Sequence, residues 1–211
     1  MASAVKTRLT LEMRSPDQLV RARLIPQITL RAVPADDAVL VRIFHEVGDR
    51  HLWSAKSWAS WGSPPAKRQW LIDVDSEPAG LLTLLTNRTG DVEVVTFGLV
   101  PDRQGQGLGG AALTLAVDLA TACAGGATRV WLHTNNFDHP SALPNYVKRG
   151  FTVVDQQVLH VEVPDGWHPP GAADGPTPPT GASPDLSRCA FGYRASPTDL
   201  VGDCYPVRPG S

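Results

Sequence analysis

Cysteine, net charge and long apolar runs are all scarce in this sequence, and each scarcity argues against a class of protein. The 211 residues include three cysteines with no Cys-x-x-Cys pair, which argues against a disulfide scaffold or a cysteine zinc site. The formal net charge of -2 gives no electrostatic basis for binding nucleic acid or anionic membranes. No apolar run could cross a bilayer, and the N-terminus lacks a signal-peptide pattern. We therefore expect a cytoplasmic protein with reduced thiols, with a Cys189–Cys204 bridge as a minor alternative.

Composition divides the chain into three parts. A hydrophobic content of 42% is enough for one core of ordinary size, so we expect a single domain. Residues 1–27 are interpreted as a lead-in with one strand-like stretch, Thr7–Met13. Residues 28–163 carry the strand and helix patterns. Residues 164–211 form a tail rich in proline and glycine, which cannot bury a core of its own.

The periodicities in the middle part predict an α/β domain. Asp36 or Asp37 is suited to cap the first helix, and Asp75–Pro78 is typical of a hairpin turn. We assign Trp70 and Trp131 to core strands. Strands are expected at 27–33, 69–74, 79–85, 91–97, 128–134, 151–154 and 157–163, and helices at about 37–51, 111–122 and 140–148.

The most informative segment is the run Leu-Val-Pro-Asp-Arg-Gln-Gly-Gln-Gly-Leu-Gly-Gly at residues 99–110. It follows a strand rich in β-branched residues and precedes an almost entirely apolar helix. Glycines at such a turn let the backbone approach a ligand closely, and a helix N-terminus offers unpaired N–H groups to an anion. We therefore expect the N–H groups of residues 105–110 to bind a diphosphate.

One interpretation of this run is a dinucleotide site. Gly105, Gly107 and Gly110 satisfy Gly-x-Gly-x-x-Gly, but that motif also requires an acidic residue about 20 positions later. No Asp or Glu lies between Asp118 and Asp138, so the dinucleotide reading is weak. A P-loop is excluded because no Gly-Lys-Ser/Thr follows.

The other register, Gln104-x-x-Gly107-x-Gly109, resembles the Arg/Gln-x-x-Gly-x-Gly/Ala signature of the GNAT acyltransferase superfamily. A second segment, residues 129–151, is similar to the strand, crossing loop, short helix and closing Tyr-x-x-x-Gly-Phe of the same family. The residues that carry this second match are Ala142, Tyr146, Gly150 and Phe151. His139 stands where the family often has Asn, seven residues before the Tyr, which puts the usual contact to pantetheine in doubt.

The resemblance covers roughly residues 28–163 and implies a fold and a cofactor. The GNAT fold is a mixed, mostly antiparallel central sheet, flanked by about four helices and splayed at the cofactor strand. The implied co-substrate is acetyl-CoA, with no metal. Its pantetheine arm would pair with the strand before the loop, and the N–H of Leu99 or Val100 would face the thioester oxygen. The expected cofactor-binding residues are Phe97, Leu99, Val100, Gln104, Gly105, Gln106, Gly107, Leu108, Gly109 and Gly110.

Two residues are candidates for proton transfer. Tyr146, at the family's motif position, keeps its proton at neutral pH and could donate it to a leaving thiolate, although a packed core aromatic is the simpler interpretation. Glu93 lies on the strand that leads to the cofactor, among valines that could raise its pKa toward that of a base. An exposed Glu on a sheet face is equally compatible with the sequence.

The substrate side is expected to involve Trp53, Trp58 and His139. The tryptophans lie where GNAT enzymes form a substrate wall, and they would suit an apolar, aromatic or cationic amine. Core packing would explain the same residues. His139 and His133 flank the crossing loop, where a structural role is the commoner one.

These observations favour an acetyl-CoA-dependent N-acyltransferase that acts on a primary amine of a small molecule by direct attack on the thioester. We expect no nucleic-acid or membrane partner, and a homodimer is left open. An acyl-CoA sensor without turnover is the first alternative. A dinucleotide-dependent oxidoreductase is the second.

Overall fold

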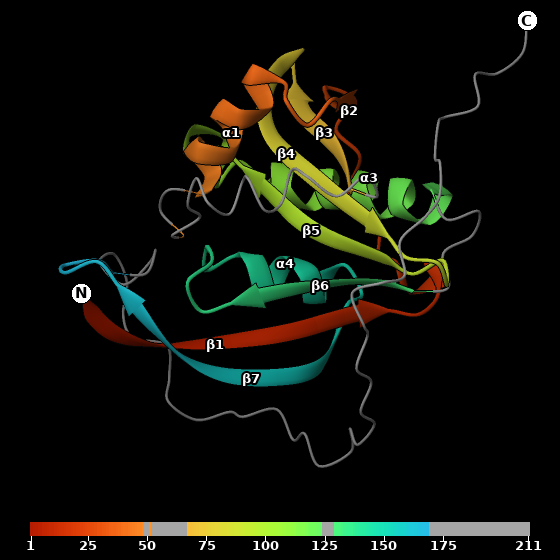
Figure 1. The fold of residues 1–211 in the computed structure, drawn as a ribbon. Coiled ribbons are helices and arrows are strands. Elements are labelled where there is room, and N and C mark those ends of the chain that lie inside the picture. Colours follow the sequence, from red (N-terminus) through yellow and green to blue (C-terminus); the bar gives the residue numbers. More distant parts are fainter. Residues whose placement is uncertain (49–50, 52–66, 124–128, 169–211) are drawn as a thin grey trace, which may run out of the picture.

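The computed structural model describes residues 1–48, 51, 67–123 and 129–168, which form a seven-stranded sheet in the order β2-β3-β4-β5-β6-β1-β7 (Figure 1). All neighbouring strands are antiparallel except β5 and β6. The strands are β1 (Ala2–Met13), β2 (Ile28–Val33), β3 (Lys67–Val74), β4 (Glu77–Thr86), β5 (Val92–Leu99), β6 (Val130–Asn135) and β7 (Thr152–Val163). The helices are α1 (Ala38–Gly48), α3 (Leu108–Cys123) and α4 (Ala142–Lys148), with short 3-10 turns at Pro16–Gln18 and Pro101–Arg103. The predicted α/β class, with a mixed and mostly antiparallel sheet, is confirmed.

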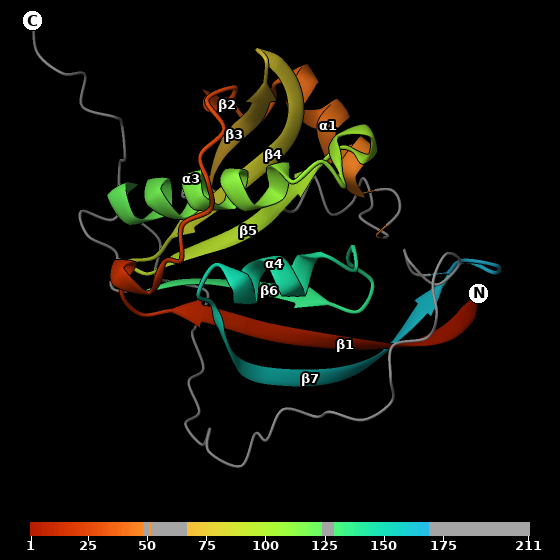
Figure 2. The same ribbon diagram turned by 180° about the vertical axis from the view of Figure 1, so that it is seen from behind.

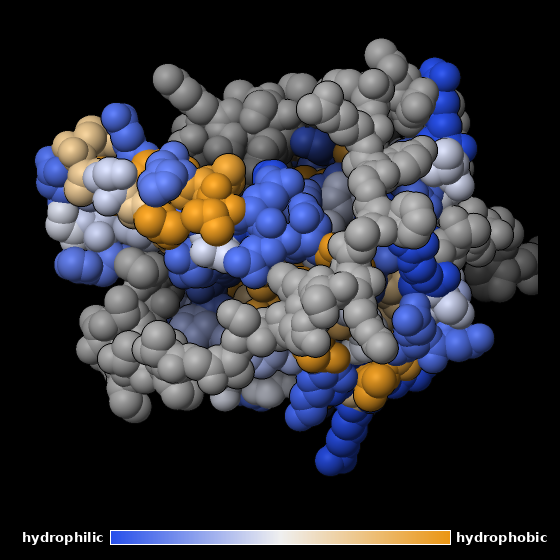
Figure 3. Space-filling model, turned by 90° about the horizontal axis from the view of Figure 1, so that it is seen from below, coloured by the Kyte–Doolittle hydropathy of each residue, from blue (hydrophilic) through white to orange (hydrophobic). Residues whose placement is uncertain are grey.

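The N-terminal strand corrects our reading of residues 1–27 as a lead-in. Strand β1 lies between β6 and β7; it pairs with β7 along most of its length and with β6 over its second half, from Arg8 to Met13 (Figures 1 and 2). The strand-like stretch Thr7–Met13 is the second half of this longer strand. Residues before 28 are therefore part of the sheet itself, and β2 and β7 form its two edges. Seen from the side of β1 and β7, the described surface is largely hydrophilic with small apolar patches (Figure 3).

The two faces of the sheet pack against different helices, because successive strand residues point to opposite sides. Leu82 and Leu84 of β4 pack with Leu113 of α3, in the cluster that also contains Trp70. Leu81, which directly precedes Leu82, packs with Phe44 of α1 on the other face. Figures 1 and 2 show α3 and α4 together on one side of the sheet.

Local chemistry accounts for several of these elements. The Asp37 carboxylate accepts hydrogen bonds from the N–H groups of Val39 and Leu40, at 2.8 and 3.0 Å, which confirms the predicted cap of α1. That helix ends at Gly48, before the expected His51. Asp75 and Ser76 both have positive φ angles in the β3–β4 turn, as a tight hairpin requires.

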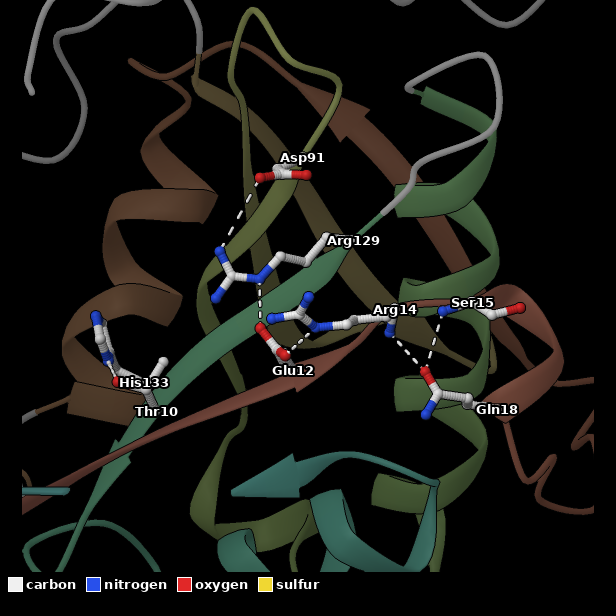
Figure 4. A network of polar contacts seen from close by, with 8 residues as sticks. All are labelled: Thr10, Glu12, Arg14, Ser15, Gln18, Asp91, Arg129 and His133. Atoms are coloured by element: carbon white, nitrogen blue, oxygen red, sulfur yellow. Dashed lines mark hydrogen bonds and ion pairs between the residues drawn. The ribbon is translucent and has the colours of Figure 1, made fainter. Parts of the chain in front are cut away.

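A buried carboxylate fixes β1 to its neighbours on the face opposite α3 and α4. Glu12 is 5% exposed and accepts hydrogen bonds from the Nε atoms of Arg14 and Arg129 (Figure 4). Arg129 also reaches Asp91, with its Nη1 4.0 Å from the carboxylate. Trp131, which the sequence assigns to the core, is only partly buried and stacks on the Arg129 guanidinium on this face of the sheet.

Candidate active site

The sheet opens at the boundary between β5 and β6. The two strands pair with each other only from Val92–Val130 to Val94–Leu132 and separate beyond that point. The register between β4 and β5 shifts at Val95, which skips one residue of β5. A bulge of this kind bends the strand, so β5 turns away from β6 and leaves the last four residues of β5 facing a gap.

The main chain of β5 presents hydrogen-bonding groups to this gap. The Val100 N–H donates to the Ala79 carbonyl at 2.9 Å. In an antiparallel pair, hydrogen-bonded and non-bonded positions alternate, so the N–H groups of Phe97 and Leu99 point away from β4 and toward the gap. Of the two N–H groups that we expect to face a thioester oxygen, only that of Leu99 therefore remains a candidate.

The glycine-rich loop follows directly. Gly105 and Gly107 have φ angles of 73° and 76°, and a Cβ at either position would meet no atom within 4 Å. These glycines are therefore required by backbone conformation rather than by crowding. The loop leads into α3 at Leu108, so the unpaired N–H groups of the first helical turn lie beside it.

The side chains of the two loop glutamines donate hydrogen bonds to nearby main-chain carbonyls. Gln104 Nε2 donates to the Leu99 carbonyl at 2.8 Å, and Gln106 Nε2 donates to the Asp102 carbonyl at 2.6 Å. Gln104 lines the cavity described below, whereas Gln106 and Val100 do not. The family-like position of Gln104 thus anchors the end of β5 through its side-chain amide.

One cavity of about 1220 Å³ runs from the glycine loop through the gap to the opposite face of the sheet. It brings together Tyr146, Glu93 and most of the loop residues expected from the sequence. Trp53 and Trp58 lie outside the described residues. The predicted site residues that line the cavity are Glu93, Phe97, Leu99, Gln104, Gly105, Gly107, Leu108, Gly109, Gly110, His139 and Tyr146.

Tyr146 and Glu93 differ in environment. Tyr146 is 7% exposed, between the rings of Phe97 and Phe151, and burial raises the pKa of its hydroxyl, followed by the nearby Asp138 charge. Glu93 is half-buried, and desolvation raises its pKa to about 7, against the opposing charges of Lys67 and Arg129. The Tyr146 hydroxyl therefore stays protonated at neutral pH, whereas the Glu93 carboxyl titrates near neutral pH.

Comparison with known proteins supplies the family. The model of the acetyltransferase (GNAT) family matches residues 38–151, which is more than half of the chain. The chain belongs to the GNAT acetyltransferase family. The dinucleotide-dependent oxidoreductase is thereby set aside, and acyl transfer is the activity typical of the family. No curated protein matches the sequence.

Solved structures share the GNAT fold. A GCN5-related N-acetyltransferase from Kribbella flavida is 20% identical, with a TM-score of 0.54 over 75% of this chain and 58% of that one. Another from Sphaerobacter thermophilus is 18% identical, with a TM-score of 0.57 over 74% and 51%. A functionally unknown protein from Staphylococcus epidermidis is 14% identical, with a TM-score of 0.55 over 75% and 62%. This GNAT chain thus spans between about half and three fifths of their lengths.

The two histidines that flank the GNAT crossing loop each have a hydrogen-bonding neighbour. His139 Nδ1 accepts the Ser141 N–H at 3.2 Å, at the start of α4. His133 Nδ1 lies 3.2 Å from the Thr10 hydroxyl (Figure 4), and partial burial, then the Arg8 charge, lowers its pKa. Among the described residues no group of His, Cys, Asp and Glu is arranged to hold a metal, and no helix is long and apolar enough to span a membrane.

Sequence reasoning missed the cations that line the cavity, among them Arg8, Lys67 and Arg149. Lys67 lies in the same row of the sheet as Glu93, with Leu85 between them, and burial lowers its pKa. Arg149 immediately precedes the glycine of Tyr-x-x-x-Gly-Phe, so a charged residue inside that motif was the available signal.

Proposed function

We propose that this GNAT protein transfers an acetyl group from acetyl-CoA to the primary amine of a small molecule, by direct attack of the amine on the thioester. The observation that carries the proposal is that the glycine loop, Tyr146 and Glu93 line one and the same cavity. An anion-binding loop, a proton donor and a base thus face a common space. These are groups that acyl transfer from a thioester can use.

The residues at one end of the cavity fit the proposed co-substrate. The open positions around Gly105 and Gly107 and the N–H groups of the first turn of α3 suit a diphosphate. The outward N–H groups of Phe97 and Leu99 suit an extended amide-bearing arm that pairs like a strand. Acetyl-CoA, when bound, supplies the activated thioester.

Three groups of the protein act on the reaction. The Leu99 N–H stabilises the negative charge that develops on the thioester oxygen, and removal of such a donor costs roughly 3–4 kcal/mol of barrier in other enzymes. The Tyr146 hydroxyl, held protonated by burial, donates its proton to the departing sulfur. Glu93 takes one proton of the incoming ammonium, directly or through a water molecule. With a pKa of about 7, it is substantially ionised at physiological pH yet basic enough to accept that proton. The second proton, which the nitrogen loses as the amide forms, replaces the one that Tyr146 gives to the sulfur.

We further propose that Trp53, Trp58 and His139 contact the acceptor amine. His139 lines the cavity, and aromatic side chains would contact the apolar or cationic part of an amine. We expect the reaction to take place in the cytoplasm, without nucleic-acid or membrane partners and without a metal. A homodimer is the alternative to a monomer.

The test is to mix the protein with acetyl-CoA and a panel of amino acids, polyamines, aminoglycosides and peptides, and to follow the release of free thiol. Thiol release that depends on both acetyl-CoA and one class of amine is the expected result. Calorimetric binding of CoA without thiol release from any amine would favour the sensor. Binding of neither CoA nor acetyl-CoA would contradict the proposal.

A further inference from the structure

Arg149 is a buried cation that has no charge partner in the part of the chain that the structure describes. Its side chain is 6% exposed at the C-terminal end of α4, and its Nε has no hydrogen-bond partner among the described residues. No ion pair within the described ranges includes its guanidinium. Burial of a charge is costly unless a counter-charge and hydrogen bonds compensate for it. An anion that completes the site would remove this cost.

The guanidinium lies beside the first turn of α3. Its Nη1 is 3.6 Å from the point where a Cβ on Gly110 would stand, and both residues line the cavity. Asn145, one turn earlier on α4, donates to the Gly109 carbonyl at 3.2 Å and keeps the two helices together. The positive end of the α3 dipole and a buried guanidinium therefore face the same space.

Residues 18–23, the covering segment, cross over α3 and α4 next to Arg149 and Gly110. The Val20 N–H donates to the Arg149 carbonyl at 3.0 Å, and the Ala22 N–H donates to the Thr114 hydroxyl at 3.1 Å. Gly150 permits the close approach, because a Cβ there would lie 1.9 Å from the Gln18 carbonyl oxygen. The covering segment thus excludes water from one side of the guanidinium and leaves the cavity as its open side.

The surroundings of this end of the cavity are cationic. The Asp118 carboxylate is already paired with Arg21, with Nη2 to Oδ1 at 2.7 Å. The lining residues of the covering segment, the loop, α3 and the end of α4 include no Asp or Glu. They include the cations Arg21, Arg23, Arg103, Lys148 and Arg149.

We propose that Arg149 binds the diphosphate of the cofactor, together with the N–H groups of the first turn of α3. This inference rests on the proposed function, because it names a residue that acts on the co-substrate proposed there. A guanidinium offers several donors in one plane and pairs with phosphate oxygens in a fixed geometry. Arg149 follows α4, which carries Tyr146, so a bound diphosphate ties the helix with the proton donor to the cofactor loop.

The test compares Arg149→Met with the wild type by calorimetric titration with CoA and with dephospho-CoA, which lacks the 3′-phosphate. Loss of a charge-assisted contact should weaken binding by about 10- to 100-fold. The loss should be the same for both ligands, because both carry the diphosphate. The unliganded variant should melt no lower than the wild type, because the substitution removes an uncompensated buried charge.

Lys148→Met is the matched control, since Lys148 is an exposed cation next in sequence that lines the same cavity. It should change affinity by no more than about threefold, with an effect that salt removes. Arg149→Lys keeps the charge without the planar donors and should bind CoA several-fold more weakly than the wild type. This variant provides the test if Arg149→Met does not fold.

Wild-type affinity in the folded Arg149 variants would overturn the inference and leave the proposed function intact. A loss seen with CoA but not with dephospho-CoA would also overturn it. Failure of the wild type to bind CoA would instead contradict the proposed function.

Discussion

The side chain of Gln104 holds the main chain of Leu99: its Nε2 donates a 2.8 Å hydrogen bond to the Leu99 carbonyl. The first glutamine of the glycine loop is therefore linked to the residue whose N–H points into the gap between β5 and β6. This contact couples the geometry of the cofactor loop to the proposed site of charge stabilisation.

Gln104→Leu should disturb both ends of this link. A hydrogen bond of this kind contributes about 0.5–1.5 kcal/mol net, so kcat/KM for acetyl-CoA should fall by up to about tenfold. Gln106→Leu removes an exposed loop contact of similar form and should have a smaller effect. Steady-state kinetics of the two variants, with the same amine, decide the point. Equal losses would mean that Gln104 acts only as a loop residue.

Gly107→Ala should weaken CoA binding while the fold is retained. At a φ of 76° an alanine is strained by about 1–2 kcal/mol, so the loop would relax away from the conformation that faces the diphosphate. Gly166→Ala is the control, because it has the same φ of 76° and no atoms within 4 Å of its Cβ, at a position that does not line the cavity. Both variants should lose similar stability, but only Gly107→Ala should lose affinity in a CoA titration. Equal affinities in both would place the cofactor elsewhere.

Glu93→Gln should lower activity and raise stability at the same time. Burial raises the folded-state pKa of Glu93 to about 7, above its ordinary value of 4.5, so the folded state holds the proton more tightly than the unfolded state. This carboxyl therefore destabilises the fold progressively as the pH rises from about 4.5 to about 7, and fully above that. The melting temperature of the variant should rise relative to that of the wild type as the pH increases across this window, and the two should be equal below it.

The activity of the wild type should rise with pH as Glu93 loses its proton. kcat/KM is expected to increase through pH 7 as Glu93 ionises, and the Gln variant should lack that limb of the profile. A variant that keeps both the rate and the pH profile of the wild type would exclude Glu93 as the base.

Local sequence features were predictable because local chemistry sets them. The cap at Asp37, the hairpin turn at Asp75 and Ser76, and the positive φ of the loop glycines each follow from residues within a few positions. The place of β1 between β6 and β7 does not, because β1 pairs with strands more than a hundred residues away. Strand pairing over such distances leaves only a weak mark in periodicity.

The site was predictable in part for the same reason. Tyr146 and Glu93 could be named from a motif and a strand pattern, whereas Val100 was misjudged because its N–H depends on the phase of the β4–β5 register. Arg149 was missed because its importance comes from burial beneath residues near Val20, far away in the sequence. Trp53 and Trp58 lie outside the described residues and remain predictions.

Glu12→Ala should destabilise the fold more than the loss of an exposed ion pair does. Removal of the carboxylate leaves the partly buried Arg129 without its closest counter-charge. Because this side chain is 29% exposed and Asp91 remains 4.0 Å away, the loss should be about 1–3 kcal/mol. Glu46→Ala breaks the exposed Arg42–Glu46 pair on α1 and should cost about 0.3–0.5 kcal/mol. Chemical denaturation of both variants measures the difference. A similar small loss in both would show that the network in Figure 4 does not hold β1 in place.

Turnover by Tyr146→Phe tests the central claim most directly, namely that this cavity is where the acetyl group is transferred. The substitution removes one oxygen and leaves the packing against Phe97 and Phe151 nearly intact. General acid catalysis contributes about 10²–10⁴-fold, and a thiol is a good leaving group, so kcat should fall toward the lower end of that range with CoA affinity unchanged. Turnover within about threefold of the wild type, with both substrates saturating, would contradict the account.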